Sequence, residues 1–197
     1  MRLSVQYFEK TTIKNDDKLS KKVKEFTSTM LQQIDAMSAV VSAFSNFASL
    51  KKQITEKFQL EKEVEKIAEL YKKEGVLFEP TEQDCYVKID KTHLTRVLNN
   101  LIQNAIQSIS LKKENQITLK INTNDKFWCI EIKDNGSGIE EDIGNRIFEP
   151  NFTTKNSGMG LGLAMVKNIV HDFDGEITFI TKLGVGTTFF VKIPKVN

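Results

Sequence analysis

The sequence is poor in the residues that define several protein classes. Its two cysteines, Cys85 and Cys129, form no CxxC motif and have no histidine at metal-ligand spacing, which argues against a zinc site. No apolar run approaches the length of a membrane span, and no signal peptide opens the sequence. The net charge of +2 offers no basis for a nucleic-acid partner. We therefore expect a cytoplasmic chain with two buried thiols in a reducing compartment.

The first fifty residues have the pattern of a helical hairpin. Neither glycine nor proline occurs in residues 19–50, where apolar residues recur every seven positions. This spacing predicts one long helix whose apolar face is wide enough for a helical bundle. Residues 2–13 predict a shorter helix, and "KNDDK" predicts the turn between the two. We assign residues 1–50 to this hairpin, 51–60 to a charged linker and 61–197 to a second domain.

Residues 61–197 mix helical and strand patterns. Helical periodicity covers 60–73 and, after Asp90 as an N-cap, about 91–111. Together with a mixed, mostly antiparallel sheet, these helices predict an α+β fold, a two-layer α/β sandwich preceded by the α-helical hairpin. The loop of about 135–160 exceeds an ordinary connection, which indicates a ligand lid. The predicted strands are 76–80, 85–89, 116–123, 127–134 and the two arms of a last hairpin over 176–194.

Three glycines alternate directly before a further predicted helix. Gly158, Gly160 and Gly162 precede the apolar spacing of "LAMVKNIV", so they lie across the helix start. Backbone N–H groups and the helix dipole favour an anion there, which predicts a phosphate site. The spacing matches neither the G-x-G-x-x-G fingerprint nor the Walker sequence. A flexible loop, or glycines that allow close helix packing, explains the pattern equally well.

Two further segments have residues suited to the base of a nucleotide. Asp134 ends a strand and is followed by Gly136 and Gly138 in "DNGSGI", so its carboxylate can accept a hydrogen bond from an amine such as that of adenine. In "LGVGTTF", Thr187 follows two glycines, and its hydroxyl could face a base pocket. The alternative for both segments is an ordinary turn.

Polar side chains on the predicted helix 91–111 suit a metal ion. Asn100, Asn104 and Gln107 share a helix face that is separate from the apolar stripe. Amide oxygens are hard ligands of the kind that Mg²⁺ accepts, together with water and phosphate. The alternative is a solvated polar face, which we prefer for Gln107 and for Arg96.

The order of these segments resembles the ATP-binding domain shared by sensor histidine kinases, DNA gyrase, a heat-shock chaperone class and mismatch-repair ATPases, the GHKL superfamily with the Bergerat fold. "NNLIQNAIQSI" resembles the N box, "DNGSGI" the G1 box, "IFEPNFTTK" the F box, "GMGLGLAMVKNIV" the G2 box and "GVGTTFFVKIP" the last one. Asn151 departs from the pattern, since many members have an aromatic residue there. The resemblance implies ATP and Mg²⁺ as cofactors. The residues that it implies for the nucleotide are Asn100, Asn104, Asp134, Gly136, Gly138, Ile139, Lys155, Gly158, Gly160, Leu161, Gly162 and Thr187, with Asn104 also as the metal ligand.

The N-terminal part resembles the dimerisation and histidine-phosphotransfer hairpin of sensor kinases, with the closest likeness to nitrogen-regulation-type kinases. On this resemblance the phospho-accepting histidine lies upstream of Arg2, and neither His93 nor His171 is a candidate, so no catalytic residue is assigned. The resemblance implies a homodimer formed through the hairpin, a response-regulator partner and a cytoplasmic location. It leaves open an inner-membrane anchor upstream in the parent protein, and implies no contact of this chain with a membrane or with nucleic acid.

The expected function is that of the kinase portion of a two-component sensor histidine kinase. Such a protein binds Mg-ATP and transfers the γ-phosphoryl group to the upstream histidine, for relay to a response-regulator aspartate. Two alternatives remain: a nucleotide-binding regulatory or dimerisation module without kinase activity, and an ATPase of the same superfamily. The ATPase relatives carry a glutamate one turn before the Mg²⁺ asparagine. Here that position is Asn100, whose amide cannot act as a general base at neutral pH.

Overall fold

The computed structural model describes residues 26–30, 54–109, 114–144, 146–150, 152–153 and 160–196. The chain forms two compact units, one of Met1–Lys52 with Thr153–Met159 and the other of Gln53–Phe152 with Gly160–Asn197. In the first unit, residues 26–30 are helical, in agreement with the helix predicted there. The remainder of the predicted hairpin, with its dimer contact, lies outside the described residues, as do Lys155 and Gly158.

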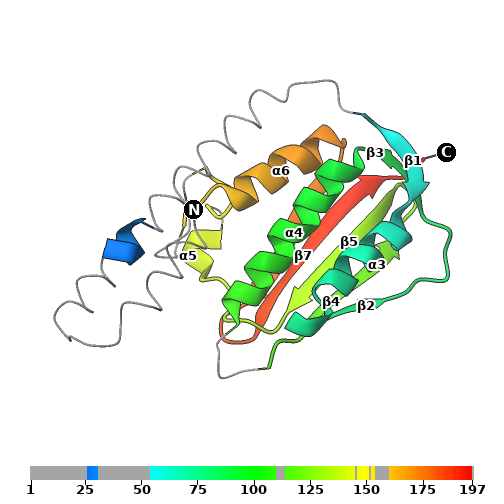
Figure 1. The fold of residues 1–197 in the computed structure, drawn as a ribbon. Coiled ribbons are helices and arrows are strands. Elements are labelled where there is room, and N and C mark those ends of the chain that lie inside the picture. Colours follow the sequence, from blue (N-terminus) through cyan, green and yellow to red (C-terminus); the bar gives the residue numbers. More distant parts are fainter. Residues whose placement is uncertain are drawn as a thin grey trace. The chain divides into compact units, whose positions relative to one another are not determined.

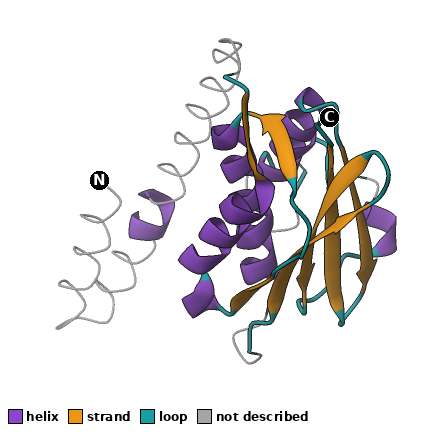
Figure 2. Ribbon diagram, turned by 90° about the vertical axis from the view of Figure 1, so that its right-hand side faces the viewer, coloured by secondary structure: helices purple, strands orange, loops and turns teal. Residues whose placement is uncertain are grey.

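The second unit is a two-layer α/β sandwich, which confirms the predicted fold class. Its elements are β1 (Glu56–Gln59), α3 (Leu60–Leu70), the 3₁₀ helix η1 (Lys72–Glu74), β2 (Val76–Glu79), β3 (Tyr86–Ile89), α4 (Lys91–Ser108), β4 (Ile117–Thr123), β5 (Phe127–Asp134), α5 (Glu141–Gly144), α6 (Gly162–Asp172), β6 (Glu176–Lys182) and β7 (Gly186–Pro194). Helices α3, α4 and α6 lie on one face of a five-stranded sheet (Figure 1, Figure 2). The strand order is β2-β4-β5-β7-β6, in which β2 and β4 are parallel and the other pairs antiparallel. Among the described helices, none is long and apolar enough to cross a membrane.

Alternation along β5 determines which of its side chains face the core. Trp128, Ile130 and Ile132 are buried in one cluster with the helices. Because side chains two residues apart share a face of a strand, Asp134 lies on this same face, and it is only 6% exposed. The strand therefore places a carboxylate at the end of the hydrophobic core. The apolar stripe predicted for residues 91–111 covers this core, since all of its members are buried: Leu94, Leu98, Leu101, Ala105 and Ile109.

Helix α4 ends at Ser108, earlier than the predicted end near Leu111. Asp90 caps its start, as predicted. At the other end, Ile109 is extended, with φ −90° and ψ 129°. The carbonyl oxygen of Ser108 accepts a hydrogen bond from Ser137 N at 3.0 Å. A contact with the loop after β5 thus accompanies the end of the helix, and this long-range contact has no signal in the local sequence.

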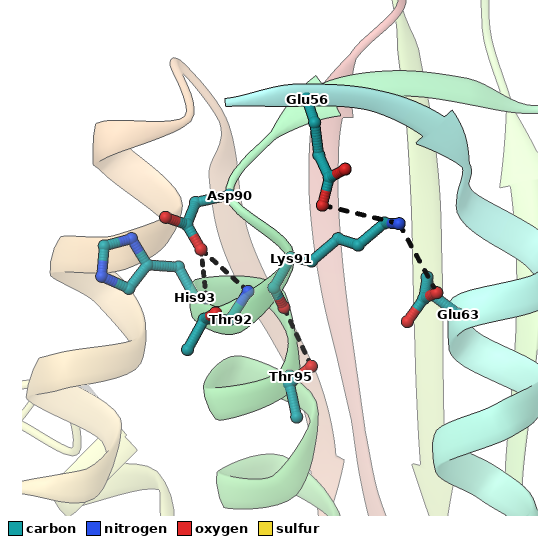
Figure 3. A network of polar contacts seen from close by, with 7 residues as sticks. All are labelled: Glu56, Glu63, Asp90, Lys91, Thr92, His93 and Thr95. Carbon is teal, nitrogen blue, oxygen red and sulfur yellow. Dashed lines mark hydrogen bonds and ion pairs between the residues drawn. The ribbon is translucent and has the colours of Figure 1, made fainter. Parts of the chain in front are cut away.

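Strand β1 ties the start of the second unit to its body. It pairs antiparallel with β3, and Phe58 within it is only 8% exposed. The ammonium group of Lys91 lies 3.5 Å from the Glu56 carboxylate and 3.9 Å from that of Glu63 (Figure 3). The same group lies 4.9 Å from the centre of the Phe58 ring. The predicted linker over 51–60 is therefore partly a strand. Its many charged residues give no strand pattern in the sequence.

Phe58→Ala is expected to lower the free energy of unfolding of the second unit by about 3 kcal/mol, because it removes a buried aromatic ring and leaves a cavity. Urea unfolding, followed by the fluorescence of Trp128 as the one tryptophan of the chain, measures this change. Lys57→Ala is the control on the same strand, since Lys57 is exposed, and it should change stability by less than about 0.5 kcal/mol. An unchanged unfolding midpoint for Phe58→Ala would show that β1 lies outside the cooperative unit.

The two cysteines differ in burial. Cys85 is fully buried, as predicted, whereas Cys129 on β5 is partly exposed, so the prediction of a buried thiol is wrong there. Cys129 alternates with Trp128 and Ile130, and it therefore lies on the face of the sheet opposite the helices. Burial of Cys85 and partial burial of Cys129 raise the pKa of each thiol above its ordinary value, which keeps both thiols protonated near neutral pH.

Candidate functional site

The carboxylate of Asp134 is the centre of a set of hydrogen-bond donors at one end of the sheet. Its Oδ1 accepts the backbone N–H of Gly136 at 2.8 Å and that of Thr187 at 3.2 Å. The Ser108 hydroxyl, which donates its proton to the Ala105 carbonyl oxygen at 2.8 Å, lies 3.4 Å from the same oxygen. Three elements converge on this buried side chain: the end of β5, the start of β7 and the last turn of α4. The donors hold the carboxylate in one orientation.

Two glycines allow the backbone to approach Asp134 closely. A Cβ at Gly136 would overlap the Ser108 Oγ and would lie 2.9 Å from Asp134 Oδ1. A Cβ at Gly186 would overlap the carbonyl oxygen of Asp134, and the φ of +144° at Gly186 is one that side chains rarely adopt. Packing around the carboxylate thus requires glycine at both positions.

One face of α4 connects Asp134 with the start of α6. Asn100, Asn104 and Ser108 are spaced four residues apart, so they form a row along the helix. Ser108 contacts Asp134 at one end of this row. At the other end, a Cβ at Gly162, the first residue of α6, would lie 2.9 Å from Asn100 Oδ1. The row spans about 12 Å, given a rise of about 1.5 Å per residue.

The start of α6 has the features of an anion site. Leu161 is the N-cap residue, and its carbonyl oxygen accepts a hydrogen bond from Met165 N at 3.0 Å. No side chain of the described residues caps this end, and no acidic residue lies in the first turn. Gly160 before it has a φ of +65°, which glycine adopts readily. The positive end of the helix dipole therefore lies beside Asn100.

The polar residues of α4 differ in their contacts and in their exposure. Asn100 Nδ2 donates to the carbonyl oxygen of Arg96 in the same helix at 2.8 Å, and this bond fixes the amide. Gln107 is exposed, in agreement with a solvated face, whereas Arg96 is partly buried. His93 is partly buried in the first turn of α4, and His171 is exposed near the end of α6, as expected of structural and surface histidines.

The loop after β5 is held against the hairpin of β6 and β7. Ile139 N donates to Thr181 Oγ1 at 2.8 Å, and Gly184 N donates to the carbonyl oxygen of Ser137 at 2.6 Å. Gly138 has a φ of +72°, and a Cβ there would overlap a carbonyl oxygen at the end of β6. The backbone of "DNGSGI" is thus fixed by close contact with the hairpin, in addition to the contacts around Asp134.

The predicted lid over 135–160 is anchored in its middle. Ile147 is 7% exposed, and the Phe148 ring packs edge-on against Phe179 with the ring centres 6.1 Å apart. These contacts join the loop to the core. Residues 154–159 lie outside the described part of the chain, and a lid that moves with the ligand stays a prediction.

Two residues that sequence analysis does not single out also belong to this site. Ser108 follows Asn104 by one helical turn, so its position on the row has a signal in the spacing. Thr181 has no such signal, because its place depends on the register in which it pairs with Thr187. The predicted residues that direct contacts place at the site are Asn100, Asp134, Gly136, Gly138, Ile139, Gly162 and Thr187.

The side-chain oxygen atoms of this site suit a magnesium ion that is bound mainly through phosphate and water. In the described part of the chain, no three His, Cys, Asp or Glu side chains cluster so as to hold a metal ion. Mg²⁺ needs no such cluster, since one amide oxygen together with phosphate oxygens and water satisfies it. Asn104, partly buried in the middle of the row, fits this arrangement.

Comparison with known proteins agrees with this geometry. Residues 89–197 match the family described as "Histidine kinase-, DNA gyrase B-, and HSP90-like ATPase". Over 179 residues the chain is 31% identical to the signal transduction histidine-protein kinase AtoS of Escherichia coli (strain K12). This match covers 86% of the chain and 29% of AtoS, so the chain spans less than a third of that relative.

Solved structures give the same result for the fold. The catalytic domain of histidine kinase ThkA matches with a TM-score of 0.64 at 29% identity, over 73% of this chain and 99% of that domain. ThkA in complex with the response regulator protein TrrA matches with a TM-score of 0.70 at 22% identity, over 99% of this chain and 57% of that chain. These matches do not confirm the finer likeness to nitrogen-regulation-type kinases. Since the family match covers more than half of the chain and includes every residue around Asp134, the chain belongs to the histidine kinase-, DNA gyrase B- and HSP90-like ATPases and contains the ATP-binding module of a sensor histidine kinase.

Proposed function

We propose that this chain is the cytoplasmic kinase portion of a two-component sensor histidine kinase. It binds Mg-ATP and transfers the γ-phosphoryl group to a histidine upstream of this sequence, for relay to a response-regulator aspartate. One observation carries the proposal: the row of Asn100, Asn104 and Ser108 runs from the Asp134 carboxylate to the start of α6. A carboxylate at one end suits the adenine amine, and an uncapped helix start at the other suits phosphate.

At the base end of the row, Asp134 accepts a hydrogen bond from the adenine amine. The backbone at Gly136, Gly138 and Ile139 lies along the base, where side chains would obstruct it. The Thr187 hydroxyl contacts the base from the start of β7. The buried position of Asp134 supports this role, because a hydrogen bond to a carboxylate is stronger in a site that excludes water.

At the phosphate end, backbone N–H groups and one lysine bind the phosphate oxygens. Asn104 would hold Mg²⁺, which when bound neutralises charge on the phosphates. Asn100 lies beside the first residue of α6 and helps to position that helix start. The chain itself contributes positioning and fixed dipoles, the main sources of catalysis in phosphoryl transfer. The proposed phosphate-binding residues are Lys155, Gly158, Gly160, Leu161 and Gly162.

The proposal includes two protein partners. One is a second copy of the chain, bound through the hairpin of residues 1–50. The other is a response regulator, by analogy with ThkA, whose crystal structure contains one.

An ATPase of the same superfamily is the less favoured function. Asn100 occupies the position of the glutamate that activates water in those enzymes. Its amide donates to Arg96 O and has no basic group at neutral pH, so it cannot take a proton from water.

Incubation with γ-labelled ATP and Mg²⁺ tests the proposal. The chain is expected to transfer label to a supplied upstream hairpin that contains the histidine, and to take up none itself, because His93 and His171 belong to helices of the ATP unit. Acid treatment then removes the label, since phosphohistidine is acid-labile and phosphoserine is not. Release of inorganic phosphate without transfer would favour the ATPase. Nucleotide binding with neither reaction would leave a regulatory module.

A further inference from the structure

The hydroxyl of Thr181, near the end of β6, connects three segments of the site. Its Oγ1 accepts a hydrogen bond from Ile139 N at 2.8 Å. The same oxygen lies 3.1 Å from Thr187 Oγ1 and 3.3 Å from the carbonyl oxygen of Gly186. Thr181 and Thr187 are direct partners in the ladder of β6 and β7, so their side chains lie on one face of the sheet. The loop after β5 and both strands of the hairpin thus meet at one oxygen.

The proton of this hydroxyl has two alternative acceptors. A hydroxyl has one proton to donate and two lone pairs that accept. The N–H of Ile139 donates to one lone pair of Thr181 Oγ1. The proton of the Thr181 hydroxyl itself then goes either to Gly186 O or to Thr187 Oγ1. In the first case Thr187 donates its own proton to Thr181 and offers a ligand only lone pairs. In the second, Thr187 accepts from Thr181 and keeps its proton for an acceptor on the ligand.

The same hydroxyl also fixes the loop that follows Asp134. Ile139 is the last residue of "DNGSGI", and its N–H is directed at Thr181. A partly buried N–H that loses its acceptor is costly, so without the hydroxyl this part of the loop would move or open. The neighbouring bond from Gly184 N to Ser137 O holds the loop to the hairpin two residues earlier and would remain.

We propose that Thr181 is a positioning residue of the nucleotide site, which aligns the Thr187 hydroxyl to donate to a ring nitrogen of the purine base and holds the loop at Ile139. The inference rests on the proposed function, because it requires a nucleotide base beside Thr187. Thr181 acts through Thr187 and Ile139, and the group that decides its role is the hydroxyl rather than the shape of the side chain.

Three variants separate the hydroxyl from the shape. Thr181→Val keeps the branched shape and removes the hydroxyl, whereas Thr181→Ser keeps the hydroxyl. Thr178→Val is the matched control, since Thr178 is a partly buried threonine of the same strand that faces the other side of the sheet and has no side-chain hydrogen bond within the described residues. Trp128 fluorescence confirms folding, and Thr181→Ala replaces the valine variant if valine prevents it.

Two measurements follow: calorimetric titration with ADP, and amide hydrogen exchange of Ile139 by NMR without nucleotide. Thr181→Val is expected to weaken ADP binding by about tenfold and to speed exchange at Ile139 by about tenfold, the size of one lost hydrogen bond. Thr181→Ser should stay within about threefold of the wild type in both, and Thr178→Val within about twofold.

ADP analogues test the alignment of Thr187. With 1-deaza-ADP, 3-deaza-ADP or 7-deaza-ADP, whichever lacks the ring nitrogen that Thr187 contacts, the effect of Thr181→Val should fall to about twofold. An equal effect of Thr181→Val on the binding of ADP and of all three analogues would overturn the alignment. Equal ADP affinities of Thr181→Val and Thr178→Val, or a loss that serine does not restore, would overturn the inference while leaving the proposed function intact. A wild-type chain that binds no ADP refutes the proposed function instead, and the exchange at Ile139 still tests the hold on the loop.

Discussion

Asp134→Asn is expected to weaken ADP binding by about ten- to a hundredfold while leaving the fold intact. The surrounding donors determine the outcome. Gly136 N and Thr187 N both point at Oδ1, so the asparagine amide will place its oxygen there and keep both hydrogen bonds. Its NH₂ group then takes the place of the second carboxylate oxygen. A donor would face the adenine amine, which is also a donor, and the charge-assisted hydrogen bond would be lost.

Calorimetric titration with ADP measures this effect, and urea unfolding monitored at Trp128 checks that stability is retained. Asp125→Asn is the matched control. It makes the same chemical change to an exposed carboxylate in the turn before β5, at the opposite end of the strand from Asp134. Equal ADP affinities of the two variants would contradict the assignment of Asp134 to the base.

Gly138→Ala is expected to lower the free energy of unfolding by about 3 kcal/mol, and Gly184→Ala by only about 1 kcal/mol. The two glycines have nearly the same φ, +72° and +75°, so the cost of about 1–2 kcal/mol for an alanine in the left-handed region is common to both. They differ in their surroundings. A Cβ at Gly138 would overlap the Lys182 carbonyl oxygen and lie 2.9 Å from Leu183 Cα, whereas one at Gly184 has no atom within 4 Å.

The overlap at Gly138 involves backbone atoms, so relief requires the loop and the hairpin to separate. Gly138→Ala should therefore also reduce ADP binding by more than tenfold, roughly the loss expected when a binding loop is displaced. Gly184→Ala should bind within about threefold of the wild type. Unfolding in urea and ADP titration of both variants measure the two effects. Similar costs for the two substitutions would show that the close contact seen at Gly138 is unimportant.

Periodicity predicts those parts of this fold that neighbours along the chain decide. The stripe on α4, the cap at Asp90 and both antiparallel hairpins follow from residue spacing, and the structure confirms them. Asp134 is predictable too, because alternation along one strand decides its face. These features depend on residues within a few turns or a few strand positions of one another.

Features that depend on distant partners have no such signal. Strand β1 has one buried residue, Phe58, among polar and charged neighbours, and only its pairing with β3 makes it a strand. Helix α4 ends where Ser108 meets Ser137, a contact across 29 positions of the chain. Thr181 acquires its place from the register of two strands and from a loop that begins far earlier in the sequence. Each of these requires the tertiary structure.

Helix α4 belongs both to the hydrophobic core and to the proposed nucleotide site. Its leucines are buried on one side, and the row of Asn100, Asn104 and Ser108 lies on the other. A helix of this kind couples the interior to the ligand. A cavity made at Leu101 would shift the row without contacting a nucleotide. A nucleotide bound along the row would raise the free energy of unfolding and so offset the loss caused by the cavity. On the proposed function, the effect of a core mutation on stability therefore depends on the concentration of ATP. A core mutation that is tolerated at high ATP would destabilise the domain when ATP is scarce.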